Sequence, residues 1–258
     1  NPAMLSLEES NTIDVNYTSW IAEQINLFGG INSVRDGRAF AFSVYSATID
    51  GIEQRDRPGP SNGDFEVSYF SIAGAVAYDL KLFSLGAAVQ FLSERNFIEQ
   101  ATGYAFNAGI ARNFKNRITI GASILNAGEM SPLINQRSQL PAQLRFGTTG
   151  LVGNFKLPGK NDFYFDAKLH ADYVHQLEEM NTVGITSVND DQGFFNIGTT
   201  LVIAEVVELM AGFRTGDTSR RANFGMGINT GEVGFNYALV PFSTGFGNAH
   251  SIGLQYRF

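Results

Sequence analysis

The last nine residues, His250-Ser-Ile-Gly-Leu-Gln-Tyr-Arg-Phe258, decide the fold class of this chain. In an extended strand Ile252, Leu254, Tyr256 and Phe258 point to one side, and the small or polar residues between them point to the other. In water such a row would be a sticky sheet edge, and chain ends usually fray unless a sheet holds them. In a lipid bilayer the same row is a suitable outer surface. The stretch therefore predicts a closing strand that faces a membrane.

The composition agrees with one large β domain over residues 1–258. The 22 Phe and 9 Tyr are a heavy aromatic load for a chain whose mean hydropathy is only -0.05, as expected when lipid-facing and water-facing residues alternate. No apolar run approaches the roughly 20 residues of a membrane helix. The net charge of -7 argues against nucleic acid as a partner, and the lack of cysteine excludes disulfides and thiolate metal sites. We expect no cofactor. Because Asn1-Pro2-Ala3 holds no initiator Met and no apolar signal segment, we also expect a processed or truncated chain.

Fourteen segments have the nine or more residues, roughly, that a tilted membrane strand needs. They are 12–20, 25–34, 38–50, 66–78, 83–93, 103–114, 118–126, 142–153, 162–173, 194–204, 206–215, 221–230, 232–240 and 250–258. In the clearest one, 162–173, apolar residues alternate with a polar row of Asp166, Lys168, His170 and Asp172. A helix would scatter these charges around its circumference, whereas a period of two separates them. The segments predict a transmembrane antiparallel β-barrel of about 14 strands, with this row facing the lumen.

The connections alternate in length, which is independent support for a barrel. Tight turns are predicted at 35–37, 79–82, 115–117, 204–205 and 230–231, and long loops at 51–65, 94–102, 127–141, 174–193 and 241–249. Outer-membrane barrels have short turns on the periplasmic rim and long loops on the outer rim. An even strand count also places both chain ends on the short-turn side.

The segment 201–210, Leu-Val-Ile-Ala-Glu-Val-Val-Glu-Leu-Met, has two interpretations. It lacks Gly, Pro and Asn, so it fits an amphipathic helix. Its β-branched content and the flanking alternation favour two strands with a tight turn at Ala204-Glu205. We predict the hairpin.

The lumen row also raises a catalytic hypothesis. Asp166 and His170 share a strand face, and Asp172 extends it, so an acid–histidine pair could act from the barrel wall. The structural alternative is a hydrated lining in which charges pair across the pore, since ionisable clusters commonly form structural networks. No Ser nucleophile elbow and no zinc-type His spacing occur in the sequence. We predict a protein that is not an enzyme and has no catalytic, metal or cofactor site.

Two further groups of residues are candidates for contacts outside the barrel. Trp20 and Phe258 are predicted to anchor the barrel at the membrane interfaces, where amphipathic rings prefer to lie. The long loops mix charged with apolar side chains, and apolar loop residues either fold inward as a plug or await a partner. The candidate partner-binding residues are Arg55, Arg57, Met130, Leu133, Ile134, Leu177, Met180 and Ile185.

Short motifs along almost the whole chain resemble a known family. They are Asn1-Pro2-Ala3, Ser19-Trp20, Gly63-Asp64-Phe65, Asn126-Ala127-Gly128, Leu140-Pro141 with Arg145 and Gly147, Gly212-Phe213-Arg214, Val240-Pro241-Phe242 and Gly247-Asn248-Ala249-His250-Ser251. As a set they resemble the PorV/PorQ family, whose members have the fourteen-stranded architecture of the fatty-acid transporter FadL. The terminal strand ending in Phe also resembles the C-terminal insertion signal of bacterial outer-membrane barrels.

The resemblance implies a non-enzymatic subunit of type IX secretion in the outer membrane of a Gram-negative-type bacterium. Such a subunit would bind translocon or cargo proteins through its extracellular loops, and its partners would be outer-membrane lipid and other protein subunits. The alternative is a FadL-like passive transporter of hydrophobic small molecules. Partners recovered with the protein would favour secretion, and a continuous apolar lateral opening would favour transport.

Overall fold

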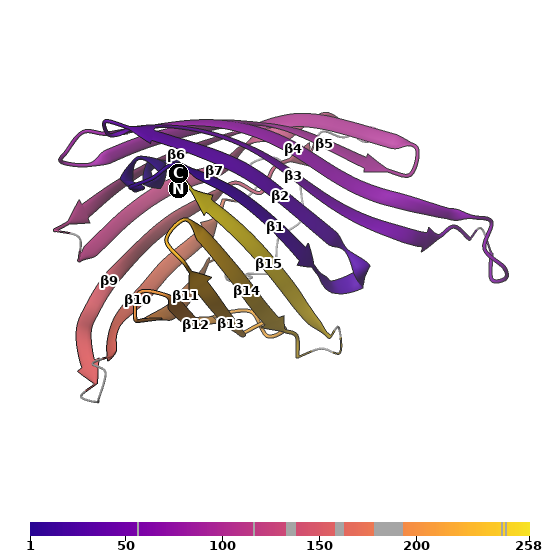
Figure 1. Cartoon of the computed structure of the whole chain (residues 1–258). Helices are drawn as coiled ribbons and strands as arrows, with labels where there is room; N and C mark the ends of the chain where they lie inside the picture. Colours follow the sequence, from indigo (N-terminus) through magenta and orange to yellow (C-terminus); the bar gives the residue numbers. More distant parts are fainter. Residues whose placement is uncertain are drawn as a thin grey trace.

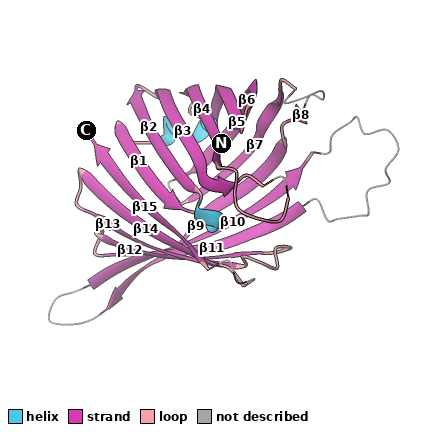
Figure 2. Cartoon of the chain, turned by 90° about the vertical axis from the view of Figure 1, so that its right-hand side faces the viewer, coloured by secondary structure: helices cyan, strands magenta, loops and turns pink. Residues whose placement is uncertain are grey.

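The computed structural model describes residues 1–55, 57–115, 117–132, 138–157, 163–177, 193–243, 245 and 247–258. Within these ranges fourteen long antiparallel strands close into one barrel, because β6 pairs with β7 where the sheet order would otherwise leave two edges (Figures 1 and 2). The strands are β1 Thr12–Ser19, β2 Ile25–Arg35, β3 Arg38–Glu53, β4 Asp64–Asp79, β5 Ser84–Asn96, β6 Glu99–Phe114, β7 Ile118–Met130, β9 Gln143–Leu157, β10 Phe163–Gln176, β11 Gly193–Ile203, β12 Val207–Arg214, β13 Ala222–Asn229, β14 Val233–Pro241 and β15 Asn248–Arg257. A two-residue strand, β8 (Ser138–Gln139), pairs with the end of β7, and short 3-10 helices span Pro2–Leu7 (η1) and Ile21–Glu23 (η2). In the described part of the chain, no helix is long and apolar enough to cross a membrane.

The terminal strand closes the barrel as predicted. β15 pairs with β1 along its length, from Thr12 opposite Arg257 to Ser19 opposite His250. Ile252, Leu254, Tyr256 and Phe258 are 43 to 55% exposed on the outer surface. On the inner face, Gln255 Nε2 donates to Asp14 Oδ1 at 2.8 Å. A closed ring of strands leaves no unpaired edge, which is the condition for a sheet to lie in lipid.

The alternation that predicted the strands is the alternation between the two faces of the wall. Phe40, Phe42 and Leu169, for example, are half exposed on the outside. The inward neighbours on the same strands are small or polar. The short segment 201–210 follows the hairpin prediction: β11 ends at Ile203, β12 begins at Val207, and both Ala204 (φ 51°) and Glu205 (φ 60°) have the left-handed backbone of a tight hairpin turn.

Two predicted loops are shorter than expected. β5 extends to Asn96 and β6 begins at Glu99, so the loop predicted at 94–102 is a two-residue tip, Phe97-Ile98. β7 likewise continues to Met130, four residues into the loop predicted at 127–141. Beyond the membrane both faces of a strand can meet water, so the apolar alternation disappears while the strand continues. Sequence periodicity cannot detect those extensions.

The barrel is taller on one side than on the other. β3, β4 and β6 have 16 residues each, whereas β12 and β13 have 8. In Figure 1, β3, β4 and β5 accordingly reach far beyond β14 and β15. The extra length lies at the rim of the long loops, which we call the long-loop rim. The opposite rim carries the tight turns, the start of β1 and the end of β15, and we call it the short-turn rim.

The N-terminal helix η1 lies inside the barrel against β4, β5 and β6. Asn1 begins it, because its side chain accepts a hydrogen bond from the backbone N–H of Ala3 at 3.0 Å, and Pro2 occupies the first helical position. The same Asn1 side chain donates from Nδ2 to the carbonyl oxygens of Ile110 (3.0 Å) and Ala122 (3.1 Å). Asn1 therefore starts the helix and fixes it to β6 and β7.

Candidate functional site

The main candidate site is an inner cavity of about 370 Å³ in the lumen, beside η1. Its walls come from η1 and from β1 to β7. The lining residues include Leu5, Phe28, Gly30, Ala41, Ser43, Ala73, Ala75, Ala88, Asn107, Leu125 and Asn126. Apolar side chains predominate, beside the Asp14 carboxylate and several amide and hydroxyl groups, and such a mixture is usual for a small organic ligand.

Small residues on the inward positions create this cavity and seat η1 below it. Ala73, Ala75 and Ala88 leave space that larger side chains would fill. The glycines at 86 and 109 lie against η1 so closely that a Cβ at either position would overlap the atoms of Asn1, Pro2 or Ala3. At these positions the N-terminal segment fills the space that side chains of the wall would otherwise occupy.

A second cavity of about 350 Å³ lies nearer the long-loop rim, and we call it the mouth cavity. Polar side chains line much of it. Its lining residues are Asn16, Thr18, Trp20, Gln24, Asn26, Leu27, Phe28 and Tyr45. Phe28 belongs to both cavities, so its ring stands where they meet.

Trp20 lies at the long-loop rim. Its ring continues the inward face of β1, lines the mouth cavity and meets Phe242 edge to face at 5.4 Å, and its role as a membrane-interface anchor stays a prediction. The Arg220 guanidinium lies 5.8 Å from the Trp20 ring centre. Arg220 Nε also donates to Asp217 Oδ2 at 2.7 Å. Residues from three connections are therefore held together at the rim.

The electrostatics of this rim favour a charged Asp217. Desolvation alone would raise the pKa of its carboxyl. Hydrogen bonds from the Arg220 side chain and from the backbone N–H groups of Ser219 and Arg220 outweigh desolvation and lower that pKa below its ordinary value. The ion pair is consequently kept at neutral pH.

A third, more polar hollow of about 320 Å³ lies between η1 and the wall formed by β7, β9 and β10, and we call it the polar chamber. Asn1 lines both this chamber and the inner cavity. The predicted lumen row borders it through His170 and Asp172. Asp172 accepts from Arg145 and from Asn196, each at 3.0 Å. Asp172 is therefore paired with an arginine on the neighbouring strand β9, and the pairing across the pore expected for the row stays a prediction.

The other members of the row give no catalytic geometry. His170 holds Thr149 Oγ1 through Nδ1 and Thr200 Oγ1 through Nε2, both at 3.0 Å. Asp166 accepts from Asn154 Nδ2 at 2.5 Å, and Lys168 shares the same strand face. The hydrogen bonds described for Asp166 and Asp172 come from Asn154, Arg145 and Asn196, and His170 bonds to two threonines instead. A general base needs an orienting partner, and here threonine hydroxyls occupy both nitrogens.

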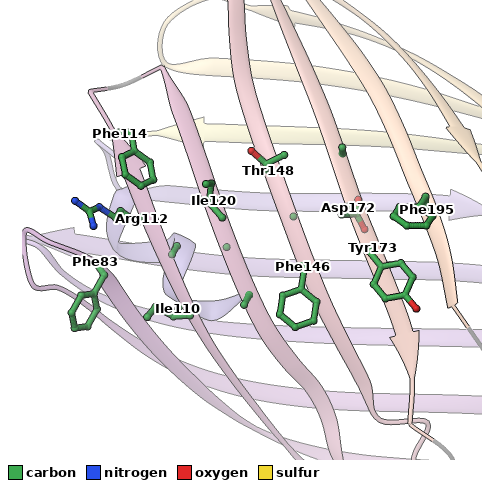
Figure 3. Close-up of a pocket in the computed structure, with 15 residues that line it drawn as sticks. Phe83, Ile110, Arg112, Phe114, Ile120, Phe146, Thr148, Asp172, Tyr173 and Phe195 are labelled. Atoms are coloured by element: carbon green, nitrogen blue, oxygen red, sulfur yellow. The ribbon is translucent and has the colours of Figure 1, made fainter.

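A large groove of about 640 Å³ lies on the outside of the same wall (Figure 3). Figure 3 shows Ile110, Ile120 and Phe146 on neighbouring strands, and all three are exposed. The groove and the polar chamber share Gly121 and Gly147, which are direct cross-strand partners on β7 and β9. These two glycines add no side chain to the wall, and on the lumen side the side chains of Asn1 and Asp172 lie against them.

The predicted partner-binding residues have different environments. Arg55 is exposed and donates to Glu53 and to the carbonyl of Gly59, and Arg57 is exposed as well. Leu177 is 37% exposed. The prediction that Met130 meets a partner from a loop is wrong. Met130 lies in β7, is only 4% exposed, and packs inward against Leu92, Ala101 and Ala105. Leu133, Ile134, Met180 and Ile185 fall outside the described residues, and the anchoring role of Phe258, exposed and stacked on Tyr256, stays a prediction.

Sequence reasoning missed η1 and Phe28. The signal for η1 was present, since Asn followed by Pro is a favoured start of a helical turn. The alternation of Ile25, Leu27 and Ile31 placed Phe28 on the opposite, inward face, but nothing in it indicated that the ring lies between two cavities.

The comparisons with known proteins give the fold. No family profile matches the chain, and no curated protein sequence does. Solved structures do: the P. putida toluene transporter TodX has a TM-score of 0.61 at 10% identity, over 100% of this chain and 92% of that one. The monoaromatic hydrocarbon channel CymD gives 0.61 at 13% over 100% and 91%, and a Pseudomonas aeruginosa FadL homologue gives 0.54 at 11% over 100% and 93%.

The chain is therefore an outer-membrane β-barrel of the FadL-like architecture. Its outer surface faces lipid, and its lumen holds the three hollows described above. At these identities the likeness describes architecture alone, so activity has to be argued from the lumen.

Proposed function

We propose that this barrel is a passive transporter of hydrophobic small molecules across the outer membrane. The observation that carries the proposal is the inner cavity. Barrel channels for polar solutes have polar, water-filled interiors. Here the inner cavity is lined mainly by apolar side chains, with Leu5, Phe28 and Leu125 around a floor of alanines and Asp14 as its one carboxylate among the described lining residues. Its volume of about 370 Å³ suits a small organic ligand.

The sequence of hollows supports a path for such a solute. The mouth and inner cavities share Phe28, and the inner cavity and polar chamber share Asn1, while the paired strands β7 and β9 separate the chamber from the outer groove. A hydrophobic solute would gain free energy on leaving water for the inner cavity. The solved structures of a toluene transporter and a hydrocarbon channel with this architecture point in the same direction.

Uptake by cells tests the proposal. A strain lacking its own hydrophobe channels would express the barrel and receive labelled toluene, with a labelled sugar as the polar control. We expect toluene uptake above that of the empty vector and no gain in sugar uptake. Ala73→Trp, which fills the inner cavity, should abolish the gain, whereas Val76→Trp, on the outer face of the same strand, should preserve it. Uptake unchanged by Ala73→Trp would refute the cavity as the route.

The secretion hypothesis from sequence remains the rival, although no comparison supports it. Replacing residues 178–192 by a Gly-Ser turn separates the two, since loop length alone costs little closure entropy. On the transport proposal, toluene uptake depends on the lumen and persists in the shortened barrel. Two results together would favour secretion. The shortened barrel would fold but take up no toluene, and the native protein purified in detergent would bring secretion subunits with it.

A further inference from the structure

Phe28 occupies the boundary between the mouth cavity and the inner cavity. On the inner face of the wall it lies opposite Asn16 of β1 and Tyr45 of β3. Tyr45 meets Tyr69 of β4 edge to face at 6.0 Å, so aromatic rings form a row across three strands at this level. On one side of the row the lumen is polar, and on the other it is lined by alanine.

The ring of Phe28 rests on a glycine. A Cβ at Gly30, the next inward residue of β2, would lie 2.9 Å from Phe28 Cζ and 3.2 Å from Cε1. Such distances leave no room for a side chain, so the ring lies along the wall over Gly30. Phe28 is nevertheless 38% exposed, which means that much of the ring faces open lumen.

A ring in this place sets the width of the passage between the mouth cavity and the inner cavity. Lying on Gly30, it leaves the passage beside it open, and any rotation away from the wall would bring the ring across that passage. Its surroundings are apolar on the inner side, so it would discriminate by shape and not by hydrogen bonding. Aromatic side chains have few rotatable bonds, and their positions are correspondingly well defined.

We propose that Phe28 is the size-selecting residue of the lumen, which admits narrow hydrophobes to the inner cavity and slows wider, polycyclic ones. The class of solute in this inference rests on the proposed function. The width of the passage beside Phe28 is a property of the barrel alone. It can therefore be measured without transport.

The first experiment uses thiol modification from outside intact cells. The chain has no cysteine, so Ala73→Cys places one thiol in the inner cavity and Asn26→Cys places one in the mouth cavity. A small and a bulky methanethiosulfonate reagent are compared at each position. Adding Phe28→Ala should raise the bulky-to-small rate ratio at Ala73→Cys by about tenfold, a typical steric effect in an apolar pocket. The ratio at Asn26→Cys should not change.

Two further variants complete the design. Gly30→Ala removes the resting place of the ring and should lower the ratio at Ala73→Cys, because the ring then projects into the lumen. Phe40→Ala removes a ring of the same size from the outer surface and should leave the ratio unchanged. Heat-modifiable gel mobility checks that each variant is folded. Equal ratios in wild type, Phe28→Ala and Gly30→Ala would overturn the proposal.

The second experiment compares uptake of toluene with uptake of phenanthrene. Phe28→Ala should increase phenanthrene uptake relative to toluene, and Phe28→Trp should decrease it. If the wild-type barrel takes up neither hydrocarbon but the thiol ratios respond as expected, the transport function fails and the constriction at Phe28 stands. If uptake occurs and the thiol ratios do not respond, transport stands and Phe28 is not its filter.

Discussion

Gly86 on β5 and Gly109 on β6 are direct cross-strand partners, and the N-terminal helix η1 lies across this pair. A Cβ at Gly86 would overlap the backbone of Pro2 and Ala3, and a Cβ at Gly109 would overlap the side chain of Asn1. The seat of the N-terminal segment is thus made by two missing side chains. Adding a side chain at one of these glycines therefore tests how much the N-terminal segment contributes to the stability of the barrel.

Gly109→Ala should destabilise the barrel by about 1–3 kcal/mol, the usual cost of overpacking a close contact. The matched control is Gly74→Ala on β4, where an added Cβ would have nothing within 4 Å. Urea unfolding in lipid vesicles measures both. Equal free energies of unfolding for the two variants would mean that η1 does not pack as described.

Leu169 is exposed on the lipid-facing side of β10, so Leu169→Arg should cost about 2–4 kcal/mol, as for a charge placed near the middle of a bilayer. Ser43→Arg projects instead into the inner cavity of the lumen and should cost clearly less. The same unfolding titration measures this difference. A larger loss of stability for Ser43→Arg than for Leu169→Arg would mean that the lipid-facing and lumen-facing sides of the wall have been assigned the wrong way round.

Orientation in the membrane can be tested at the two rims. Ser61→Cys lies in the exposed connection between β3 and β4 on the long-loop rim, and Glu232→Cys lies in a tight turn on the short-turn rim. An impermeant thiol reagent added to intact cells should label the cysteine at 61 and spare the one at 232. Labelling of the second alone would invert the barrel.

Asp217 predicts a pH dependence that Trp20 can report. Because the carboxyl pKa is lower in the folded barrel than in the unfolded chain, its pair with Arg220 contributes stability fully above the ordinary pKa of about 4. That contribution is lost as the pH falls through the lower folded value. Trp20, the chain's single tryptophan, lies beside Arg220, so its fluorescence should change in that acid range. Asp217→Asn should abolish the change, and Asp36→Asn in a short turn should retain it.

The strand pattern was predictable because lipid and water impose opposite demands on alternate residues. Leu169 and the polar residues beside it obey this rule, and so does the pairing of the last strand with the first. The rule weakens where water lies on both sides, which is why the ends of β5 and β7 were placed too early and the start of β6 too late.

The candidate site was much less predictable. Phe28 and Trp20 carry rings that, by residue type alone, favour lipid, yet both share the inward parity of polar neighbours, Asn26 and Thr18, and line the mouth cavity. The contacts that these rings make depend on neighbours far apart in sequence, such as Phe242 against Trp20. Met130 was predicted to meet a partner but fills an inner cluster with Leu92, since it ends a strand that the alternation did not extend. A single sequence indicates which face a residue prefers and not which space its neighbours leave.

The pairing of β1 with β15 also constrains how the molecule is made. Gln255 and Asp14, which are hydrogen-bonded across this seam, are 241 positions apart. Until the last strand arrives, β1 exposes one unpaired edge and a row of apolar side chains, and such long-range pairings form slowly. A newly made chain must cross an aqueous compartment in that state, where open edges aggregate. The seam therefore implies dependence on escort proteins that hold the chain unfolded until the membrane can complete the ring.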